Sequence, residues 1–248
     1  MLLTTLSLPF PLHPADIPKL RAAIIGSLGY GHTLFNGFDN SEQGKEKYAN
    51  VYPLVEYGVH KGKARILGIG AGADAIVRHL APNLPDQLLI GERYVETRPF
   101  RLEVDDWRPD ILPQQYTFGL HRYVALNKKN YRAWKALEGN EPARRELLSA
   151  CLTGHLRALA ETAAPELNRK QIKARVLQVD KVKRIKWHGT QLVAFDLVAC
   201  ANFIPPFGLG LGRCHSFGFG EVCNQQRYNH LAGSRNKSTG SSRAAVPH

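Results

Sequence analysis

The sequence predicts an α+β fold of two tandem ferredoxin-like (RRM-like) βαββαβ domains, the second one degraded and carrying a C-terminal glycine-rich loop. In the first 94 residues, strand-like and helix-like segments follow one another in the order β-α-β-β-α-β, which is that of the split βαβ unit. The second half repeats this order, with a glycine-rich stretch where the last helix would stand. We therefore expect a first domain over 1–94, a second over 95–223 and a disordered tail over 224–248.

The elements of the first domain follow from the spacing of its apolar residues. Alternation of apolar and polar residues indicates strands, and apolar residues at i, i+3 and i+4 indicate helices. The predicted elements are a strand over 2–10, a helix over 14–27, strands over 51–57 and 63–69, a helix over 71–80 closed by Pro82, and a strand over 87–94. A loop rich in glycine and asparagine, residues 29–40, follows the first helix.

The stretch Gly68-Ile-Gly70-Ala-Gly72 allows two interpretations. A strand that runs through spaced glycines into a helix resembles a dinucleotide-binding fingerprint. Here the third glycine comes early, Ala73 occupies the position after it, and no second parallel strand-helix-strand unit follows. A tight turn with close packing between strand and helix fits the stretch better.

The second domain is predicted in the same way. Its expected elements are strands over 93–104 and 116–126 around a proline-marked loop at 107–113, helices over 128–137 and 141–162, hairpin strands over 171–187 and 191–203 that turn at His188-Gly189, and a short strand over 217–222. His155 lies on the apolar stripe of the long helix, where a packed core histidine is the simpler interpretation.

Composition restricts the class of protein. The chain has 248 residues, of which 44% are hydrophobic, and no run of apolar residues is long enough for a transmembrane helix. The N-terminus lacks the features of a signal peptide, and the four cysteines show no regular spacing. We therefore expect a cytoplasmic protein with free thiols, no membrane association and no cofactor. The net charge of +12 and the isoelectric point near 9.7 favour a polyanionic partner, most simply a nucleic acid.

The glycine-rich loop over 207–220 is the first candidate binding site. It holds five glycines and two cations within fourteen residues, directly after the Pro205-Pro206 break. Glycine is costly where it is not needed, so this density suggests backbone N–H groups that cradle phosphates. A loose linker is the alternative, which the apolar residues between the glycines disfavour. The predicted RNA-binding residues of this loop are Gly208, Gly210, Gly212, Arg213, His215, Gly218 and Gly220.

The first strand of the hairpin that precedes the loop is the second candidate binding site. In an extended strand alternate residues share a face, so Lys181 and Lys183 lie on one side and Arg184 and Lys186 on the other. Neither side is cleanly apolar, and we expect this end of the hairpin to project from the sheet and contact an RNA stem. An edge strand protected from aggregation by its lysines is the alternative.

His32 is the candidate catalytic residue, with Tyr30 as its helper. His32 stands in the glycine-flanked loop after the first helix, and an imidazole can give or take a proton near neutral pH. RNA carries its own nucleophile, the 2′-hydroxyl, so proton transfer and some positive charge suffice for cleavage. No cluster of Asp, Glu and His has metal-ligand spacing, which favours a metal-free reaction. A surface histidine without a function is the alternative.

These features resemble the repeat-associated mysterious protein (RAMP) superfamily, and within it the CRISPR-associated endoribonuclease that cuts precursor CRISPR RNA. The resemblance covers most of residues 1–222, and its motifs are the glycine loop ending in Phe217-Gly-Phe-Gly220, Leu20-Arg-Ala-Ala-Ile24, His32-Thr-Leu-Phe-Asn36, Tyr52-Pro-Leu-Val-Glu-Tyr57 and Lys63-Ala-Arg-Ile-Leu-Gly-Ile-Gly70. It implies a metal-independent endoribonuclease that leaves a 2′,3′-cyclic phosphate. It also implies CRISPR repeat RNA and other CRISPR effector-complex subunits as partners, and a monomer or homodimer.

One departure from the family pattern keeps a second function open. Relatives in this branch often carry Phe-His-Asn-His where this chain has Phe35-Asn36-Gly37-Phe38. If those histidines perform the reaction in relatives, His32 is either the remaining acid or base, or the protein binds RNA without cutting it. The alternative function is therefore a catalytically inactive RNA-binding subunit that holds processed CRISPR RNA.

Overall fold

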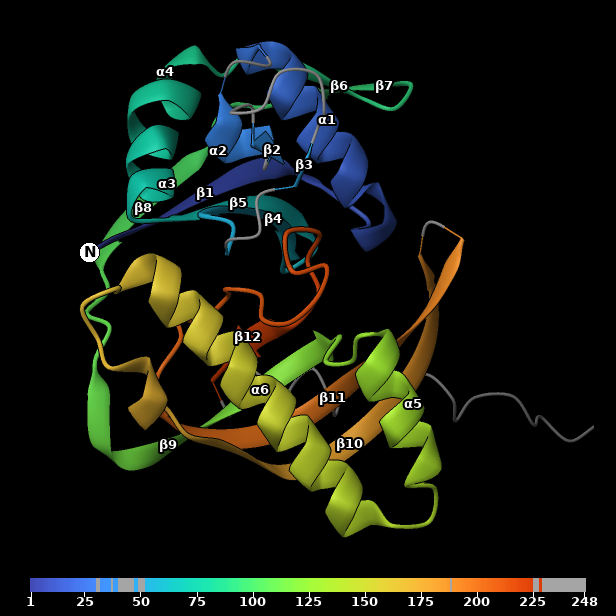
Figure 1. Ribbon diagram of the computed structural model, residues 1–248. Helices are drawn as coiled ribbons and strands as arrows, with labels where there is room; N and C mark the ends of the chain where they lie inside the picture. The colour runs from blue at the N-terminus through green and yellow to red at the C-terminus, as the bar shows by residue number, and fades with distance from the viewer. Residues whose placement is uncertain are drawn as a thin grey trace, which may run out of the picture.

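The structure is a computed structural model that describes residues 1–29, 32–36, 38–39, 47–48, 52–187, 189–224 and 228. Two four-stranded antiparallel sheets form the two halves of the molecule, one above the other in Figure 1. Helices of the first half cover the upper face of its sheet. The lower face of the same sheet turns toward the second half.

The first sheet has the strand order β4-β5-β1-β8, which is the ferredoxin-like order. Its strands are β1 (Leu2–Pro11), β4 (Val55–His60), β5 (Lys63–Ile69) and β8 (Arg101–Asp106). The central strand β1 alternates buried and partly exposed residues, and Leu6 pairs with Ile66 on one side and Leu102 on the other. The alternation that predicted this strand therefore places its apolar residues in the core.

Two helical segments cover this sheet. They are α1 (Ile17–Leu28) and a continuous run made of α3 (Ala71–Ala75), a π-helical turn η2 (Ile76–Leu80) and α4 (Ala81–Asn83). Gly68 permits the close approach of strand and helix, because a Cβ there would lie 2.7 Å from the backbone nitrogen of Ala73. The glycine stretch is thus a tightly packed turn, as the second interpretation of the sequence predicts.

The end of the first domain differs from the prediction. The segment expected as one strand over 87–94 is a hairpin of β6 (Gln87–Ile90) and β7 (Arg93–Glu96), which turns at Gly91 with a φ of 68°. The strand that completes the first sheet is β8, which pairs with β1. The first sheet therefore extends past the expected boundary at residue 94, and the strand expected over 93–104 in the second domain belongs mostly to the first.

The second sheet repeats the same order as β10-β11-β9-β12. The elements of the second domain are β9 (Ile111–Tyr123), α5 (Lys128–Ala136), α6 (Glu141–Ala163), β10 (Ala174–Trp187), β11 (Thr190–Phe203) and β12 (Glu221–Cys223). The glycine loop connects β11 to β12 in the place of a second helix. The predicted fold class, with a degraded second copy, is confirmed.

Five short elements complete the described chain. They are η1 (Pro14–Asp16), α2 (Thr33–Asn36), β2 (Phe38–Asp39), β3 (Lys47–Tyr48) and η3 (Arg169–Gln171). None of the helices in the described ranges has the length and apolar character needed to cross a membrane. Over the same ranges, no group of three or more His, Cys, Asp or Glu side chains could hold a metal ion.

The cores of the two halves are in contact. Leu67 and Ile69 from the first sheet join the cluster formed by α6 and the second sheet. His155 on α6 is half-buried, and its Nδ1 lies 2.7 Å from the hydroxyl of Tyr123. Burial lowers the pKa of His155 to about 4, so it is neutral near pH 7, as expected of a packed histidine.

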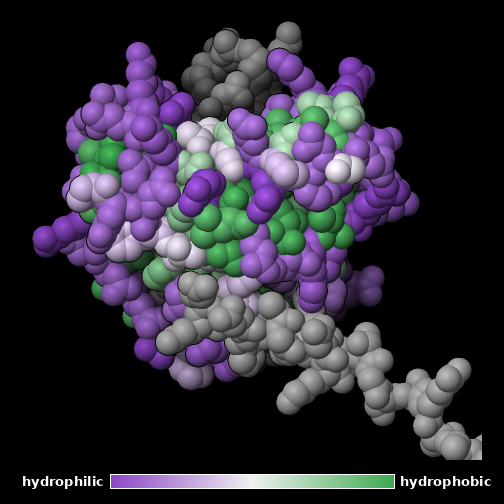
Figure 2. All heavy atoms as spheres, turned by 90° about the horizontal axis from the view of Figure 1, so that it is seen from below, coloured by the Kyte–Doolittle hydropathy of each residue, from purple (hydrophilic) through white to green (hydrophobic). Residues whose placement is uncertain are grey.

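The face of the molecule seen from below is not uniformly polar. Figure 2 shows hydrophobic residues gathered near the centre of this face, with hydrophilic residues around them. On the second domain, a groove between α6 and β10 is lined by Pro142, Ser149, Val176 and Leu177 together with charged residues. Both observations show that apolar groups reach the surface in the second half of the protein.

Candidate functional site

A pocket on the first domain contains His32, the predicted catalytic residue. The pocket has a volume of about 290 Å³ and lies between the segment after α1 and the helical run after β5. Its lining residues are His32, Thr33, Leu34, Phe35, Ala71, Asp74, Ala75 and His79. The imidazole rings of His32 and His79 lie 5.4 Å apart at their centres and are tilted by 40°. Two groups that can transfer protons therefore share one open pocket.

Phe35 anchors the turn that carries His32. Its side chain is buried in the first core, and its N–H donates a 3.1 Å hydrogen bond to the carbonyl oxygen of His32. The ring of His32 meets the ring of Phe35 edge to face at 6.2 Å. Tyr57 on β4 fixes the same turn, because its hydroxyl donates a 3.2 Å hydrogen bond to the carbonyl oxygen of Phe35.

His79 was not predicted from the sequence. It lies in the π-helical turn η2, where Ile76 and Leu80 are buried and His79 is exposed. The buried positions around it show that it lies on the outer side of the helix. No spacing in the sequence indicates that it faces a loop 47 positions earlier. Tyr30, the predicted helper of His32, lies outside the described residues.

The charged groups beside the pocket are paired. Asp74 lines the pocket, and its Oδ1 accepts a 2.6 Å hydrogen bond from Nε of Arg78. Arg78 is exposed and Asp74 is about half-exposed, so this ion pair adds little to stability. It does offset the negative charge of Asp74, which would otherwise repel a phosphate.

The glycine loop lies between the two sheets (Figure 1), and the N–H groups of four of its glycines donate within the protein. The N–H groups of Gly208, Gly218 and Gly220 donate to the carbonyl oxygens of Val222, His215 and Arg122. The N–H of Gly210 donates to Oε2 of Glu56 at 2.7 Å. These donors do not form the phosphate cradle that the sequence suggested. RNA binding by the loop residues stays a prediction that needs another physical basis.

The glycines of the loop serve close packing. A Cβ on Gly210 would lie 2.7 Å from the carbonyl oxygen of Phe219, and one on Gly212 would lie 2.7 Å from the carbonyl oxygen of Val124. Gly218 has a φ of 77°, and a Cβ there would meet Ile17 of α1 at 2.6 Å. The loop is therefore packed between the two domains.

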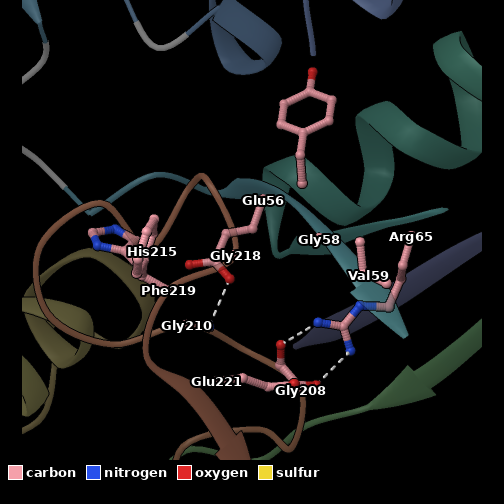
Figure 3. Close-up of a pocket in the computed structure, with 11 residues that line it drawn as sticks. Glu56, Gly58, Val59, Arg65, Gly208, Gly210, His215, Gly218, Phe219 and Glu221 are labelled. Atoms are coloured by element: carbon pink, nitrogen blue, oxygen red, sulfur yellow. Dashed lines mark hydrogen bonds and ion pairs between the residues drawn. The ribbon is translucent and has the colours of Figure 1, made fainter. Parts of the chain in front are cut away.

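Two charged residues of the first sheet hold the loop (Figure 3). Arg65 on β5 donates from Nη2 to the carbonyl oxygen of Gly208 at 2.5 Å, and its Nη1 lies 3.6 Å from Oε1 of Glu221. Glu56 on β4 accepts the N–H of Gly210. The cavity between these groups has a volume of about 20 Å³, which is room for about one water and too little for a phosphate.

Glu56 is a buried carboxyl whose pKa is raised to about 8, mainly by burial. The hydrogen bonds with Gly210 and Tyr52 act against this rise in pKa, and burial outweighs them. Tyr52 has one hydroxyl proton but lies within hydrogen-bond distance of two oxygens, Oε1 of Glu56 at 2.8 Å and the carbonyl oxygen of Gly210. If Glu56 carries a proton, it can donate to Tyr52, and Tyr52 can then donate to Gly210.

The two predicted cations of the loop have different environments. Arg213 is exposed, whereas His215 is half-buried with its ring stacked on Tyr52 at 4.6 Å. Its Nδ1 contacts the carbonyl oxygen of Gly212. Burial lowers the pKa of His215 to about 4, so this imidazole is uncharged near pH 7. Of these two residues, Arg213 is therefore the one whose positive charge can attract a phosphate.

The basic hairpin has one packed face and one exposed face. Lys181 and Lys183 are partly buried, and Nζ of Lys183 lies 3.4 Å from Oδ2 of Asp196 on β11. Arg184 and Lys186 lie on the exposed face. The end of the hairpin does not project freely as expected, because Trp187 packs against Phe219 of the glycine loop with ring centres 5.2 Å apart.

Comparisons with known proteins agree with this architecture. Two solved structures each cover 90% of this chain: a crystal structure of Cas6b, 20% identical with a TM-score of 0.76 over 100% of that chain, and a crystal structure of the CRISPR RNA processing endoribonuclease Cas6b, 21% identical with a TM-score of 0.64 over 99%. At these identities, the likeness establishes the fold.

Sequence comparison identifies the family. An uncharacterised protein of Methanocaldococcus jannaschii is 33% identical over 100 residues, which are 40% of this chain and 65% of that protein. The match thus spans slightly less than two thirds of that relative. The model of the Cas6b N-terminal domain matches residues 1–107, and that of the Cas6b C-terminal domain matches residues 111–225. Both domains of one family are present in order, and the chain belongs to the Cas6b family.

Proposed function

We propose that this protein binds CRISPR repeat RNA and cleaves it within the repeat, without a metal ion. The observation that carries the proposal is the position of His32, which shares an open pocket with a second imidazole. Membership of the Cas6b family supports the substrate class, since one solved Cas6b structure is described as a CRISPR RNA processing endoribonuclease.

The reaction uses the RNA's own 2′-hydroxyl. A base removes its proton, the 2′-oxygen attacks the adjacent phosphorus, and the bond from phosphorus to the 5′-oxygen breaks. An acid gives the departing oxygen a proton, so the products are a 2′,3′-cyclic phosphate and a 5′-hydroxyl. His32 is the proposed residue for one of the two proton transfers. Tyr30 remains a predicted helper, and replacing it with phenylalanine tests that role.

The proposed RNA-binding surface combines the exposed cations of the second domain. Arg184 and Lys186 lie on the open face of the hairpin, and Arg213 lies in the glycine loop. Their charges attract phosphates directly, and the glycines act by holding the loop in place. Lys183 is tied to Asp196, so it contributes to the hairpin's structure more than to binding. Other effector-complex subunits, and a monomeric or dimeric state, remain predictions from the family resemblance.

A catalytically inactive RNA-binding subunit is the second candidate function. It is favoured by Asn36 and Phe38, which stand where relatives in this branch often carry histidines. Such a protein would hold processed CRISPR RNA with the same surface and would need no proton-transfer residues.

One experiment separates the two functions. End-labelled repeat RNA is incubated with the protein in excess EDTA, and binding and cleavage are measured in the same samples. We expect cleavage, with a product that carries a cyclic phosphate. Binding without cleavage in either EDTA or magnesium would support the inactive subunit, and cleavage only with magnesium would contradict the metal-free reaction.

A further inference from the structure

We propose that His79 is the second catalytic residue of this site, and that it performs the proton transfer that His32 does not. This inference rests on the proposed function, because it assigns a residue to the same cleavage reaction. The two histidines come from different elements, His32 from the segment before α2 and His79 from η2. The fold alone brings them together.

The distance between the rings suits one phosphodiester. The oxygen that attacks and the oxygen that leaves lie on opposite sides of the phosphorus, and each needs its own proton-transfer group. A nitrogen reaches an oxygen over about 2.6–3.2 Å. Rings whose centres are 5.4 Å apart and tilted by 40° can each direct one nitrogen to a different oxygen of the same phosphate.

The local backbone presents His79 to the pocket. The turn over Ile76–Leu80 is π-helical. Such turns are rare in proteins as a whole, and those that occur are often at functional sites. Ile76 and Leu80 are fully buried, which fixes the turn against the sheet, while His79 stays open to solvent. A histidine on the exposed side of a helix normally has no second imidazole beside it. A shared role in proton transfer would explain why His79 lies next to His32.

The other groups around the pocket are compatible with a bound phosphate. Asp74 and Arg78 are the charged residues on the helical run beside His79, and they are paired with each other. The remaining described lining residues are Thr33, Leu34, Phe35, Ala71 and Ala75, none of which carries a charge. Among the described lining residues, the two imidazoles are therefore proton-transfer groups that are not held in an ion pair, unlike Asp74.

The test compares His32→Ala and His79→Ala under single-turnover conditions, with His13→Ala as the matched control. His13 is an exposed histidine at the start of η1, outside the pocket. We expect each pocket variant to cut the repeat RNA about 10² to 10⁴-fold more slowly than the parent, with unchanged RNA affinity. The control should cut at the parental rate, and His79→Gln should behave like His79→Ala.

A modified substrate assigns the two roles. When sulfur replaces the 5′-oxygen that leaves, departure no longer needs an acid, so a variant that lacks the acid regains its rate. We expect this substrate to rescue one of the two variants and not the other. A parental rate for His79→Ala, or rescue of both variants or of neither, would overturn the proposal for His79 while cleavage by the parent still stands. A parent that binds the unmodified RNA and cannot cut it would overturn both proposals.

Discussion

The hydroxyl of Tyr57 donates a 3.2 Å hydrogen bond to the carbonyl oxygen of Phe35, in the turn that carries His32. Tyr57 lies on β4, the edge strand of the first sheet, and its backbone N–H donates to the carbonyl oxygen of Ser216 in the glycine loop at 3.4 Å. One residue thus contacts both the candidate catalytic turn and the loop between the domains.

Tyr57→Phe should slow cleavage without weakening RNA binding. The change removes the bond to Phe35 but keeps the ring, so the turn that carries His32 loses one restraint. The matched control is Tyr123→Phe, which removes the buried contact between the Tyr123 hydroxyl and His155 in the second domain. Each variant should lose about 0.5–1.5 kcal/mol of stability. Single-turnover rates should fall for Tyr57→Phe alone, and an equal fall for both would show that the rate only follows stability.

Glu56 should make the protein less stable as the pH rises. Its pKa is raised to about 8 in the folded state from an ordinary value of 4.5, so the folded state holds the proton more tightly. This stabilisation is complete below about pH 4.5 and is lost as the pH rises to about 8. His155 and His215 act in the opposite sense, because their pKa values are lowered to about 4 and their stabilisation is lost as the pH falls from 6.5 toward 4.

Between pH 6.5 and 8, the effect of Glu56 on stability can therefore be measured apart from that of the two histidines. Over these 1.5 units, stability measured by urea unfolding should fall by up to about 2 kcal/mol in the parent, at about 1.4 kcal/mol per unit. Glu56→Gln keeps the shape of the side chain and cannot ionise, so its stability should change much less over the same window. A parallel dependence on pH in the two proteins would show that another group is responsible.

Gly210→Ala should destabilise the protein by about 1–3 kcal/mol, because the new Cβ would lie 2.7 Å from a backbone oxygen that must move. Gly154→Ala is the control: Gly154 lies within α6 with nothing within 4 Å of a Cβ, so the same change should stabilise the helix slightly. Thermal unfolding measures both. An unchanged melting temperature for Gly210→Ala would mean that the loop is not held as tightly as its contacts indicate.

Replacing Arg184 and Lys186 with alanine should weaken RNA binding and make it less dependent on salt. Each phosphate contact contributes roughly 0.9 to the slope of log K against log salt for a duplex, so the slope should fall by about 1.8. The control removes Arg98 and Arg101, two exposed arginines of the first domain. If both pairs of substitutions lower the slope equally, the effect is one of net charge rather than of the hairpin.

The sequence allowed the fold to be predicted because both domains follow the simple periodicities of strand and helix. The end of the first domain could not be placed, since β6, β7 and β8 all read as extended segments and only pairing with β1 distinguishes β8. The density of glycines suggested a phosphate cradle, whereas the structure uses these glycines for close packing. That density could not show that the close partners are Glu56, Arg65 and Ile17 of the same chain.

The candidate site was predicted in part for a similar reason. His32 has a local signal, because it stands in a glycine-flanked loop after a helix. His79 has none, because its relation to His32 arises from the packing of two distant segments. The burial that leaves His215 uncharged near pH 7 likewise depends on Tyr52, which is remote in sequence.

The most direct test of the central claim is the single-turnover rate of repeat-RNA cleavage in EDTA by the parent and by His32→Ala, at protein concentrations that saturate binding for both. We predict that the parent produces a 2′,3′-cyclic phosphate and that His32→Ala does so about 10² to 10⁴-fold more slowly at the same RNA affinity. Equal rates for the two proteins, or RNA that is bound and left uncut by the parent, would contradict it.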